Sequence, residues 1–234
     1  MKATDWEFAN RALLFGLIFA FTFPLYSVDH QNSTAAMANW LAAGLRTDAN
    51  LVAHLLFAFA AFFVVAAALI RTWASSYLEA EVVYAADIRT ESLVADGPYR
   101  RVRNPLYFAN VLMTVGLGAF MSRIGFLVAV VAMLVFCYRL IVREEAELQA
   151  SQGEQYERYL KAVPRLLPSI RARAVSGNHR ARWTEGFKAE SWNWGFAAAA
   201  VAFAVTLKLM LFFVILGASV VLLWASSAFL SRLK

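Results

Sequence analysis

The sequence has little of what a metal-binding or disulfide-bonded protein needs. Its 234 residues include one cysteine and three histidines, and only 16% of them are charged. Cys137 alone cannot form an intramolecular disulfide, and the scattered histidines have no metal-ligand spacing, so we expect no metal site. Soluble domains usually contain about 25% charged residues, whereas here 61% of the residues are hydrophobic. This composition is typical of a membrane protein and exceeds what one globular core requires.

Six apolar runs predict six transmembrane helices. They cover residues 11–26, 51–70, 106–121, 124–142, 192–207 and 209–230. A helix needs about 20 residues to cross the hydrocarbon core, so the third and fifth runs are short. They would either extend past these bounds or form tight hairpins with the runs that follow. The turns would lie at Arg123 and Lys208, although Lys208 also fits one long bent helix from which its side chain reaches the interface. We therefore predict an all-α, multi-pass integral membrane protein.

The net charge of +6 is concentrated in residues that flank the apolar runs. With six crossings, four basic groups fall on one side of the membrane, and the other side receives only Arg46, Arg123 and Lys208. The positive-inside rule then places the two long polar segments in the cytoplasm. No aromatic-basic recognition motif accompanies these charges, so we expect no nucleic acid. The expected partners are the lipid bilayer and a lipophilic substrate, and the oligomeric state is left open.

The polar segments divide the chain into three parts. Residues 1–70 contain the first two helices, residues 71–170 a cytoplasmic loop, a helical hairpin and a polar helix, and residues 171–234 a basic connection and a C-terminal hairpin. The stretch 144–161 is rich in Glu, Ala, Leu and Gln, which predicts that it continues the fourth helix into the cytoplasm. Pro164 and Pro168 should end this helix, and residues 171–190 should form a surface connection.

An arginine-rich turn precedes the third apolar run. Gly97 and Pro98 predict a turn, and Pro105 predicts a helix start because it disfavours helical backbone at Asn104. The arginines before this helix start are Arg100, Arg101 and Arg103. A helix N-terminus attracts anions, so this arrangement suits a carboxylate or phosphate at the membrane surface. The same residues would also serve as an ordinary basic loop beside a membrane span.

Glu144 and Glu145 are adjacent carboxylates just beyond the fourth apolar run. They are either ordinary solubilising charge on a helix or partners for a cation. S-adenosylmethionine carries a sulfonium, an ammonium, a carboxylate and a ribose. A carboxylate can bind its ammonium or its ribose hydroxyls, and aromatic rings can face its cation.

Taken in order, these stretches resemble the isoprenylcysteine carboxyl methyltransferase family, which is related to membrane phospholipid N-methyltransferases. The resemblance covers about residues 71–168. It rests on Leu93, Val94, Gly97, Pro98, Tyr99, Arg103, Asn104, Pro105, Leu106 and Tyr107, and, after a hydrophobic hairpin, on Glu144, Glu145, Leu148, Gly153, Tyr156, Tyr159, Pro164, Arg165 and Pro168. It implies S-adenosyl-L-methionine as the cofactor, held in a cytoplasm-facing pocket that the polar helix closes. Lipophilic substrate would enter from the bilayer.

The resemblance also implies which residues form the site. Those at the cofactor would be Glu91, Leu93, Val94, Tyr99, Asn104, Pro105, Leu106, Tyr107, Glu144 and Glu145. Those with a catalytic role would be Arg103, Arg139, Arg143 and Glu144. The family commonly has histidine where Asn104 stands, and because asparagine cannot take up a proton, we assign no base there. The substrate-facing arginine is expected at Leu140, which Arg139 and Arg143 flank.

Methyl transfer is a direct displacement at the sulfonium methyl, so the protein must align the reactants and exclude water. A carboxylate nucleophile is already ionised, whereas an amine or thiol needs a base, and no histidine is well placed to act as one. This difference favours carboxyl O-methylation of an isoprenylcysteine-like or other lipophilic carboxylate. Phospholipid N-methyl transfer and thiol S-methyl transfer are the alternatives.

Two other classes of protein share part of the pattern. Sterol reductases of the steroid 5-alpha-reductase type bind NADPH and have Gly-Glu soon after an Arg-His-Pro-Asn-Tyr motif. Here Phe108, Ala109 and Asn110 follow Tyr107, so that glutamate is absent. A non-catalytic adaptor or transporter should have more ionisable residues at mid-membrane than this sequence has. The methyltransferase is therefore the preferred prediction, with its methyl acceptor unassigned.

Overall fold

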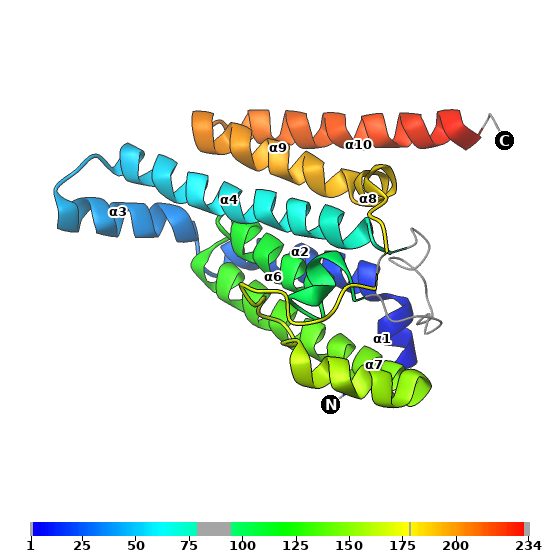
Figure 1. Cartoon of the computed structure of the whole chain (residues 1–234). Helices are drawn as coiled ribbons and strands as arrows, with labels where there is room; N and C mark the ends of the chain where they lie inside the picture. The colour runs from blue at the N-terminus through cyan, green and yellow to red at the C-terminus, as the bar shows by residue number, and fades with distance from the viewer. Residues whose placement is uncertain (1, 79–94, 178, 232–234) are drawn as a thin grey trace.

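The computed structural model describes residues 2–78, 95–177 and 179–231, and this part of the chain is all-helical, as predicted (Figure 1). Its α-helices are α1 (Asp5–Ala9), α2 (Arg11–Thr22), α3 (Ser33–Leu45), α4 (Ala49–Ser75), α6 (Pro105–Gly118), α7 (Arg123–Ala162), α8 (Trp183–Ala189), α9 (Ser191–Thr206) and α10 (Leu209–Ser231). Two short 3-10 helices, η1 (Phe23–Ser27) and η2 (Gly97–Arg100), lie between them.

Each of the six apolar runs is helical, and both predicted turns are present. The first run forms α2 and η1, and the others form α4, α6, α7, α9 and α10. Ser122 caps α7 by accepting a hydrogen bond from the Gly125 amide at 3.1 Å. Leu207 adopts a left-handed conformation with φ 52 after α9. Lys208 therefore lies in a turn between two helices and not within one bent helix.

Helix α3 is an element to which the sequence analysis assigned no structure. Asn32 caps it by accepting from the Ala35 amide at 2.8 Å. Ala38 and Ala42, one turn apart, are buried in a small cluster with Val52 of α4. Figure 1 shows α3 beside the N-terminal part of α4.

Helix α4 is the central helix of the bundle. The α9–α10 hairpin lies along one side of it, and α6 and α7 lie on the other (Figure 1). A Cβ at Gly116 of α6 would come within 2.7 Å of the Ala60 carbonyl oxygen and 2.5 Å of a Val64 methyl group. Small residues allow two helix backbones to approach closely, and this contact holds α6 against α4.

Helix α7 has two different halves. Its apolar half, residues 124–142, is the predicted fourth run, and the polar half continues it as predicted. Gly153, with φ 54 and ψ −130, interrupts the helix in the polar half. Val163 is extended, as expected for a residue before proline, so α7 ends before Pro164.

Within residues 171–190, which the sequence predicts to form a surface connection, residues 183–189 form the helix α8. Large side chains of α8 such as Trp183 and Phe187 are exposed, whereas Gly186 and the following residue, Glu190, are buried. A Cβ at Gly186 would come within 2.6 Å of the Thr72 carbonyl oxygen and 2.9 Å of the Ser76 amide nitrogen. The missing side chain at Gly186 therefore lets α8 pack directly against the end of α4.

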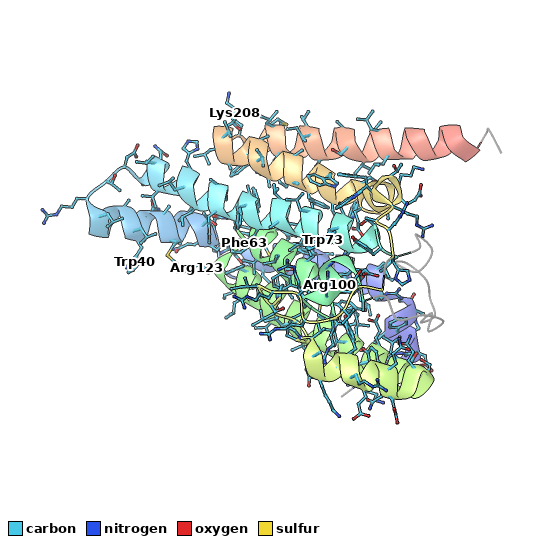
Figure 2. All side chains as sticks on the ribbon, viewed as in Figure 1. Trp40, Phe63, Trp73, Arg100, Arg123 and Lys208 are labelled. Atoms are coloured by element: carbon cyan, nitrogen blue, oxygen red, sulfur yellow. The ribbon has the colours of Figure 1, made fainter. Side chains whose placement is uncertain are left out.

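Two helices, α4 and α7, are long and apolar enough to cross a membrane by length and composition. The segments Arg11–Ser27, Pro105–Gly118 and Leu209–Leu223 are shorter apolar helices. In Figure 2, Lys208 lies at the turn between α9 and α10 and Arg123 at the start of α7, whereas Arg100 lies farther toward the C-terminal part of α4. The arginine-rich turn thus lies away from the two helix-hairpin turns.

Candidate active site

The two motif stretches lie side by side. The Arg103 amide donates to the Pro164 carbonyl at 2.9 Å, and the Arg173 amide donates to the Arg100 carbonyl at 2.7 Å. Between them, the Ser169 amide donates to the Arg101 carbonyl at 2.9 Å. The chain after α7 therefore runs back along residues 100–103 and joins the two halves of the sequence motif.

The predicted turn at Gly97 has a left-handed conformation with φ +55. A Cβ there would run into the ring of Tyr77, so the position requires glycine for two reasons. The turn leads into η2, where the Tyr99 carbonyl accepts a hydrogen bond from the Tyr159 hydroxyl at 2.7 Å. This bond ties the polar half of α7 to the first motif stretch.

Asp96 anchors the returning chain just before this turn. Its carboxylate accepts from the Ser176 hydroxyl at 2.5 Å, the Gly177 amide at 2.9 Å, and the His179 amide and Nδ1 at 3.0 and 2.7 Å. Burial acts to raise the pKa of Asp96, but these hydrogen bonds outweigh it and the pKa is lowered. Asp96 is therefore ionised at neutral pH and holds the loop that leads to α8.

Glu145 links three residues of the motif. Its Oε1 lies 3.0 Å from Arg103 Nε, and its Oε2 lies 2.8 Å from Arg165 Nη2. Asn104 Nδ2 lies 3.4 Å from the same Oε1 and donates to the Arg165 carbonyl at 2.9 Å. The side chains of Arg103 and Glu145 are only 9% and 8% exposed. The charge of Glu145 is thus neutralised by protein groups.

Glu144 has different surroundings. Its Oε1 accepts a hydrogen bond from the Tyr107 hydroxyl at 2.6 Å, and within the described residues it forms no ion pair. It lies two residues beyond the apolar half of α7. Burial raises the pKa of the Glu144 carboxyl to about 7, and the Tyr107 hydrogen bond and Arg11 oppose this rise. Glu144 is therefore a carboxylate that a bound cation would stabilise.

Arg139 and Arg143 lie on the side of α7 that faces α1. Arg139 Nη2 lies 2.6 Å from Glu7 Oε2, and Arg143 Nη1 lies 2.8 Å from Asp5 Oδ1. Leu140 between them is fully buried in the apolar cluster that contains Tyr107. The structure therefore engages both predicted catalytic arginines with acidic residues of the N-terminal helix, apart from the Glu145 cluster.

The other residues of the arginine-rich turn and of the predicted cofactor site have different surroundings. Arg100 Nε donates to the Ala174 carbonyl at 2.9 Å, and Arg101 donates to the Ile170 carbonyl, so both arginines bind the returning chain. Pro105 is buried and Leu106 half-buried at the start of α6. The predicted cofactor residues Glu91, Leu93 and Val94 lie outside the described residues.

The sequence analysis missed several polar residues near the site. Arg165 belonged to the motif but was given no role, and Arg71, Asn110 and Glu190 were not predicted as site residues. Arg71 forms a buried ion pair with Glu190, and its Nη1 donates to Asn110 Oδ1 at 2.6 Å. The available signal was position, because ionisable residues at the ends of apolar helices usually face a partner inside the bundle.

A family model described as phospholipid methyltransferase matches residues 33–155, which is just over half of the chain. The chain therefore belongs to the phospholipid methyltransferase family. The matched region includes η2, α6, the Tyr107–Glu144 pair and the Arg103–Glu145 pair, and it ends before α8. No solved structure matches the chain.

Two similar proteins bear names that refer to metal resistance. The chain is 26% identical over 137 residues to the cobalt-zinc-cadmium resistance protein CzcN of Cupriavidus metallidurans, a match that covers 58% of this chain and 60% of that protein. It is 26% identical over 100 residues to the nickel-cobalt-cadmium resistance protein NccN of Alcaligenes xylosoxydans, covering 43% and 44%. The chain thus spans three fifths or less of the curated relatives it matches. Across residues 2–78, 95–177 and 179–231, no group of three or more His, Cys, Asp or Glu side chains is placed to hold a metal ion.

The residues present fit S-adenosylmethionine in their chemistry. Glu144, a half-buried carboxylate that forms no ion pair within the described residues, suits the ammonium or the ribose hydroxyls. Tyr107 holds this carboxylate in place, and the aromatic side chains of Tyr99 and Tyr159 lie on the adjoining segments. When bound, this cofactor supplies an activated methyl group.

Proposed function

We propose that this protein is an integral membrane, S-adenosylmethionine-dependent methyltransferase that acts on a lipophilic substrate. The observation that carries the proposal is the contrast between Glu145, which Arg103 and Arg165 neutralise, and Glu144, whose carboxylate accepts a hydrogen bond from the Tyr107 hydroxyl and forms no ion pair within the described residues. A cationic ligand gives Glu144 a partner. Membership of the phospholipid methyltransferase family supports the same ligand.

We further propose six membrane crossings with the site on the cytoplasmic side. In the most apolar 18-residue stretch of each of α4 and α7, only 33% is buried inside the protein. The core helix of a soluble domain would be mostly buried. Large apolar residues such as Leu55, Phe62 and Val135 are more than half exposed, as expected for helices that face lipid. The basic residues flanking the helices support the orientation.

The chain's own residues would align the reaction and exclude water. The ion pairs of Glu145 hold residues 103–104 against residues 164–165, and the hydrogen bond between Tyr159 and the Tyr99 carbonyl closes the polar half of α7 over η2. These contacts keep water from the reacting atoms and fix their approach.

The proposed methyl acceptor is a lipophilic carboxylate, as in isoprenylcysteine carboxyl methyltransferases. An ionised carboxylate needs no base. Asn104, which occupies the usual histidine position of that family, cannot take up a proton, and its side-chain N–H donates to the Arg165 carbonyl oxygen. Phospholipid N-methylation is the second candidate, because the matching family model is described as phospholipid methyltransferase.

The test is methyl transfer from tritiated S-adenosylmethionine. Detergent-purified protein is incubated with the labelled cofactor and, in separate reactions, a farnesylated cysteine analogue and a phosphatidylethanolamine dispersion. Label should enter the organic phase with the carboxylate substrate. Mild base should then release it as volatile methanol, since methyl esters hydrolyse under these conditions and N-methyl or S-methyl groups do not.

The matched control is Glu144→Gln, which preserves side-chain size. Base-stable label on the phospholipid would show that the enzyme methylates a nitrogen and not a carboxylate oxygen, and the protein would still be a methyltransferase. Equal label in the organic phase with wild-type and Glu144→Gln protein, or label in neither reaction with the wild type, would contradict the proposal.

A further inference from the structure

A buried ion pair joins the C-terminal part of the chain to α4. Nε and Nη2 of Arg71 lie 2.5 and 3.1 Å from the two carboxylate oxygens of Glu190, the residue between α8 and α9. The Glu190 side chain is 0% exposed and that of Arg71 is 11% exposed. Ser75 Oγ and Asn193 Nδ2 donate to the same carboxylate at 2.6 and 2.7 Å. Glu190 is therefore held by donors from two helices.

The same guanidinium reaches α6. Arg71 Nη1 donates to Asn110 Oδ1 at 2.6 Å. Asn110 lies three residues after Tyr107, and residues at this spacing share one helix face. Tyr107 in turn donates to Glu144 at 2.6 Å. One face of α6 is thus fixed at two neighbouring points, by the Arg71–Glu190 pair and by Glu144 of α7.

Tyr99 links this network to the candidate site. Burial raises the pKa of the Tyr99 hydroxyl well above its usual range, and the carboxylates of Glu144 and Glu190 add to the rise, whereas Arg71 opposes it. The contacts of α6 give the same proximity, because Asn110, which binds Arg71, lies one turn from Tyr107, which binds Glu144.

Stability alone is a weak reason for such a pair. Apolar residues of similar volume usually serve a buried position as well as an ion pair does, and the neighbouring residues Ala67, Ala68 and Ala109 belong to an apolar cluster. Glu190 also lies beyond residues 33–155, the region that matches the family. The network thus ties a part of the chain outside the matched region to a helix of the site.

We propose that Glu190 and Arg71 are positioning residues of the methyltransferase site, which makes the C-terminal segment part of that site; this inference rests on the proposed function. Glu190 fixes the guanidinium of Arg71, and Arg71 fixes Asn110. Asn110 sets the rotation of α6 that places the Tyr107 hydroxyl against Glu144. Loss of the pair lets α6 turn, so the Tyr107–Glu144 pair moves although both of its residues remain.

Four variants separate positioning from stability. Glu190→Gln keeps the volume and removes the charge. The double variant R71M/E190M removes both charges and fills the space, and replacements of this kind commonly preserve or raise stability. Asn110→Ala cuts the link between the ion pair and α6. Glu185→Gln on α8, which loses an exposed contact to Lys188 at 3.0 Å, is the matched control.

Each full-length, detergent-purified variant is titrated with S-adenosylhomocysteine by calorimetry, and its Tm is measured. We expect R71M/E190M to keep the wild-type Tm, yet Glu190→Gln, the double variant and Asn110→Ala should all bind about tenfold more weakly, the effect of one misplaced hydrogen bond to a charged group. Glu185→Gln should bind as the wild type does.

Wild-type affinity in R71M/E190M would mean that the ion pair only holds the helices together, and it would overturn the proposal. Wild-type affinity in Asn110→Ala would do the same, and this single variant decides the matter if the double variant does not fold. An absence of binding to the wild-type protein is a separate result that overturns the proposed function, and this inference falls with it.

Discussion

Glu144 and Glu145 are neighbours in the sequence, but their side chains have different partners. One oxygen of Glu144 accepts a hydrogen bond from Tyr107, whereas Glu145 lies between the guanidinium groups of Arg103 and Arg165. Consecutive helical residues point about 100° apart, so the pair can serve two purposes at once. Glu144 is available to a ligand, and Glu145 joins the two motif stretches.

The affinity for S-adenosylmethionine should depend on pH through Glu144. Burial raises the pKa of this carboxyl to about 7, so below that value the side chain takes up a proton and loses its charge. Since a cationic ligand prefers the ionised form, calorimetric affinity should fall about five- to tenfold between pH 8 and pH 6.

The control for this dependence is a pair of α7 variants. Glu144→Gln should bind weakly with no change in affinity between pH 6 and pH 8. Glu147→Gln, which loses a contact of 2.9 Å to Arg143 on the same helix, should retain the dependence. A pH profile that survives in Glu144→Gln would assign the titration to another group.

Glu145→Ala should mainly reduce stability. Arg103 is 9% exposed at the side chain, and removal of its carboxylate partner leaves a buried charge without compensation, at a cost of about 3–5 kcal/mol. Thermal unfolding in detergent should show a clear fall in Tm. A Tm equal to that of the wild type would mean that water or another carboxylate reaches Arg103.

Helices and turns were largely predictable because their signals are local. The six apolar runs, the helix start at Pro105 and the helix end before Pro164 depend on hydropathy and on proline geometry alone. Helix α3 was missed because its burial depends on alanines such as Ala38, which carry a weak hydropathy signal. Helix α8 was missed because its seven residues are too few for a clear periodic pattern, and because the sequence does not reveal the close approach that Gly186 allows.

The site was predictable as a set of motif residues, and its contacts were not. Spacing within one helix could not tell which of Glu144 and Glu145 faces Arg103, because a helix can rotate about its axis. The pairing of Arg139 with Glu7 joins residues 132 positions apart. The pair formed by Arg71 and Glu190 is 119 positions apart, so only the tertiary packing brings these charges together.

Gly186→Ala should loosen the packing of α8 on α4. Its new Cβ would lie within 2.6 Å of the Thr72 carbonyl oxygen, and such overpacking costs about 1–3 kcal/mol. The matched change is Gly217→Ala in α10, where nothing lies within 4 Å of the added Cβ and stability should hold or rise. Equal Tm values for the two variants would contradict the close contact between α8 and α4.

At the scale of the whole molecule, the proposed six crossings set which end of the bundle faces the cytoplasm. Arg123 and Lys208 lie at the two helix-hairpin turns, and Arg100 lies away from both, toward the C-terminal part of α4 (Figure 2). The proposed topology places Arg100 and the other residues of the arginine-rich turn on the side with the larger number of basic residues. The candidate site and the charge bias therefore predict the same orientation.

Cysteine labelling tests this orientation with little background, because Cys137 is the only cysteine of the sequence and is buried. Thr47→Cys, in the turn between α3 and α4, should react with a membrane-impermeant maleimide in intact cells. Ser151→Cys, on the polar half of α7, should react only after the membrane is opened. If Ser151→Cys reacts in intact cells and Thr47→Cys reacts only after the membrane is opened, the proposed orientation is contradicted.

The most direct test of the central claim is calorimetric titration of the detergent-purified wild-type protein with S-adenosylhomocysteine, with NADPH as the parallel ligand. The methyltransferase account predicts saturable binding of S-adenosylhomocysteine at micromolar concentrations and no binding of NADPH. Binding of NADPH alone, or of neither ligand, would contradict it.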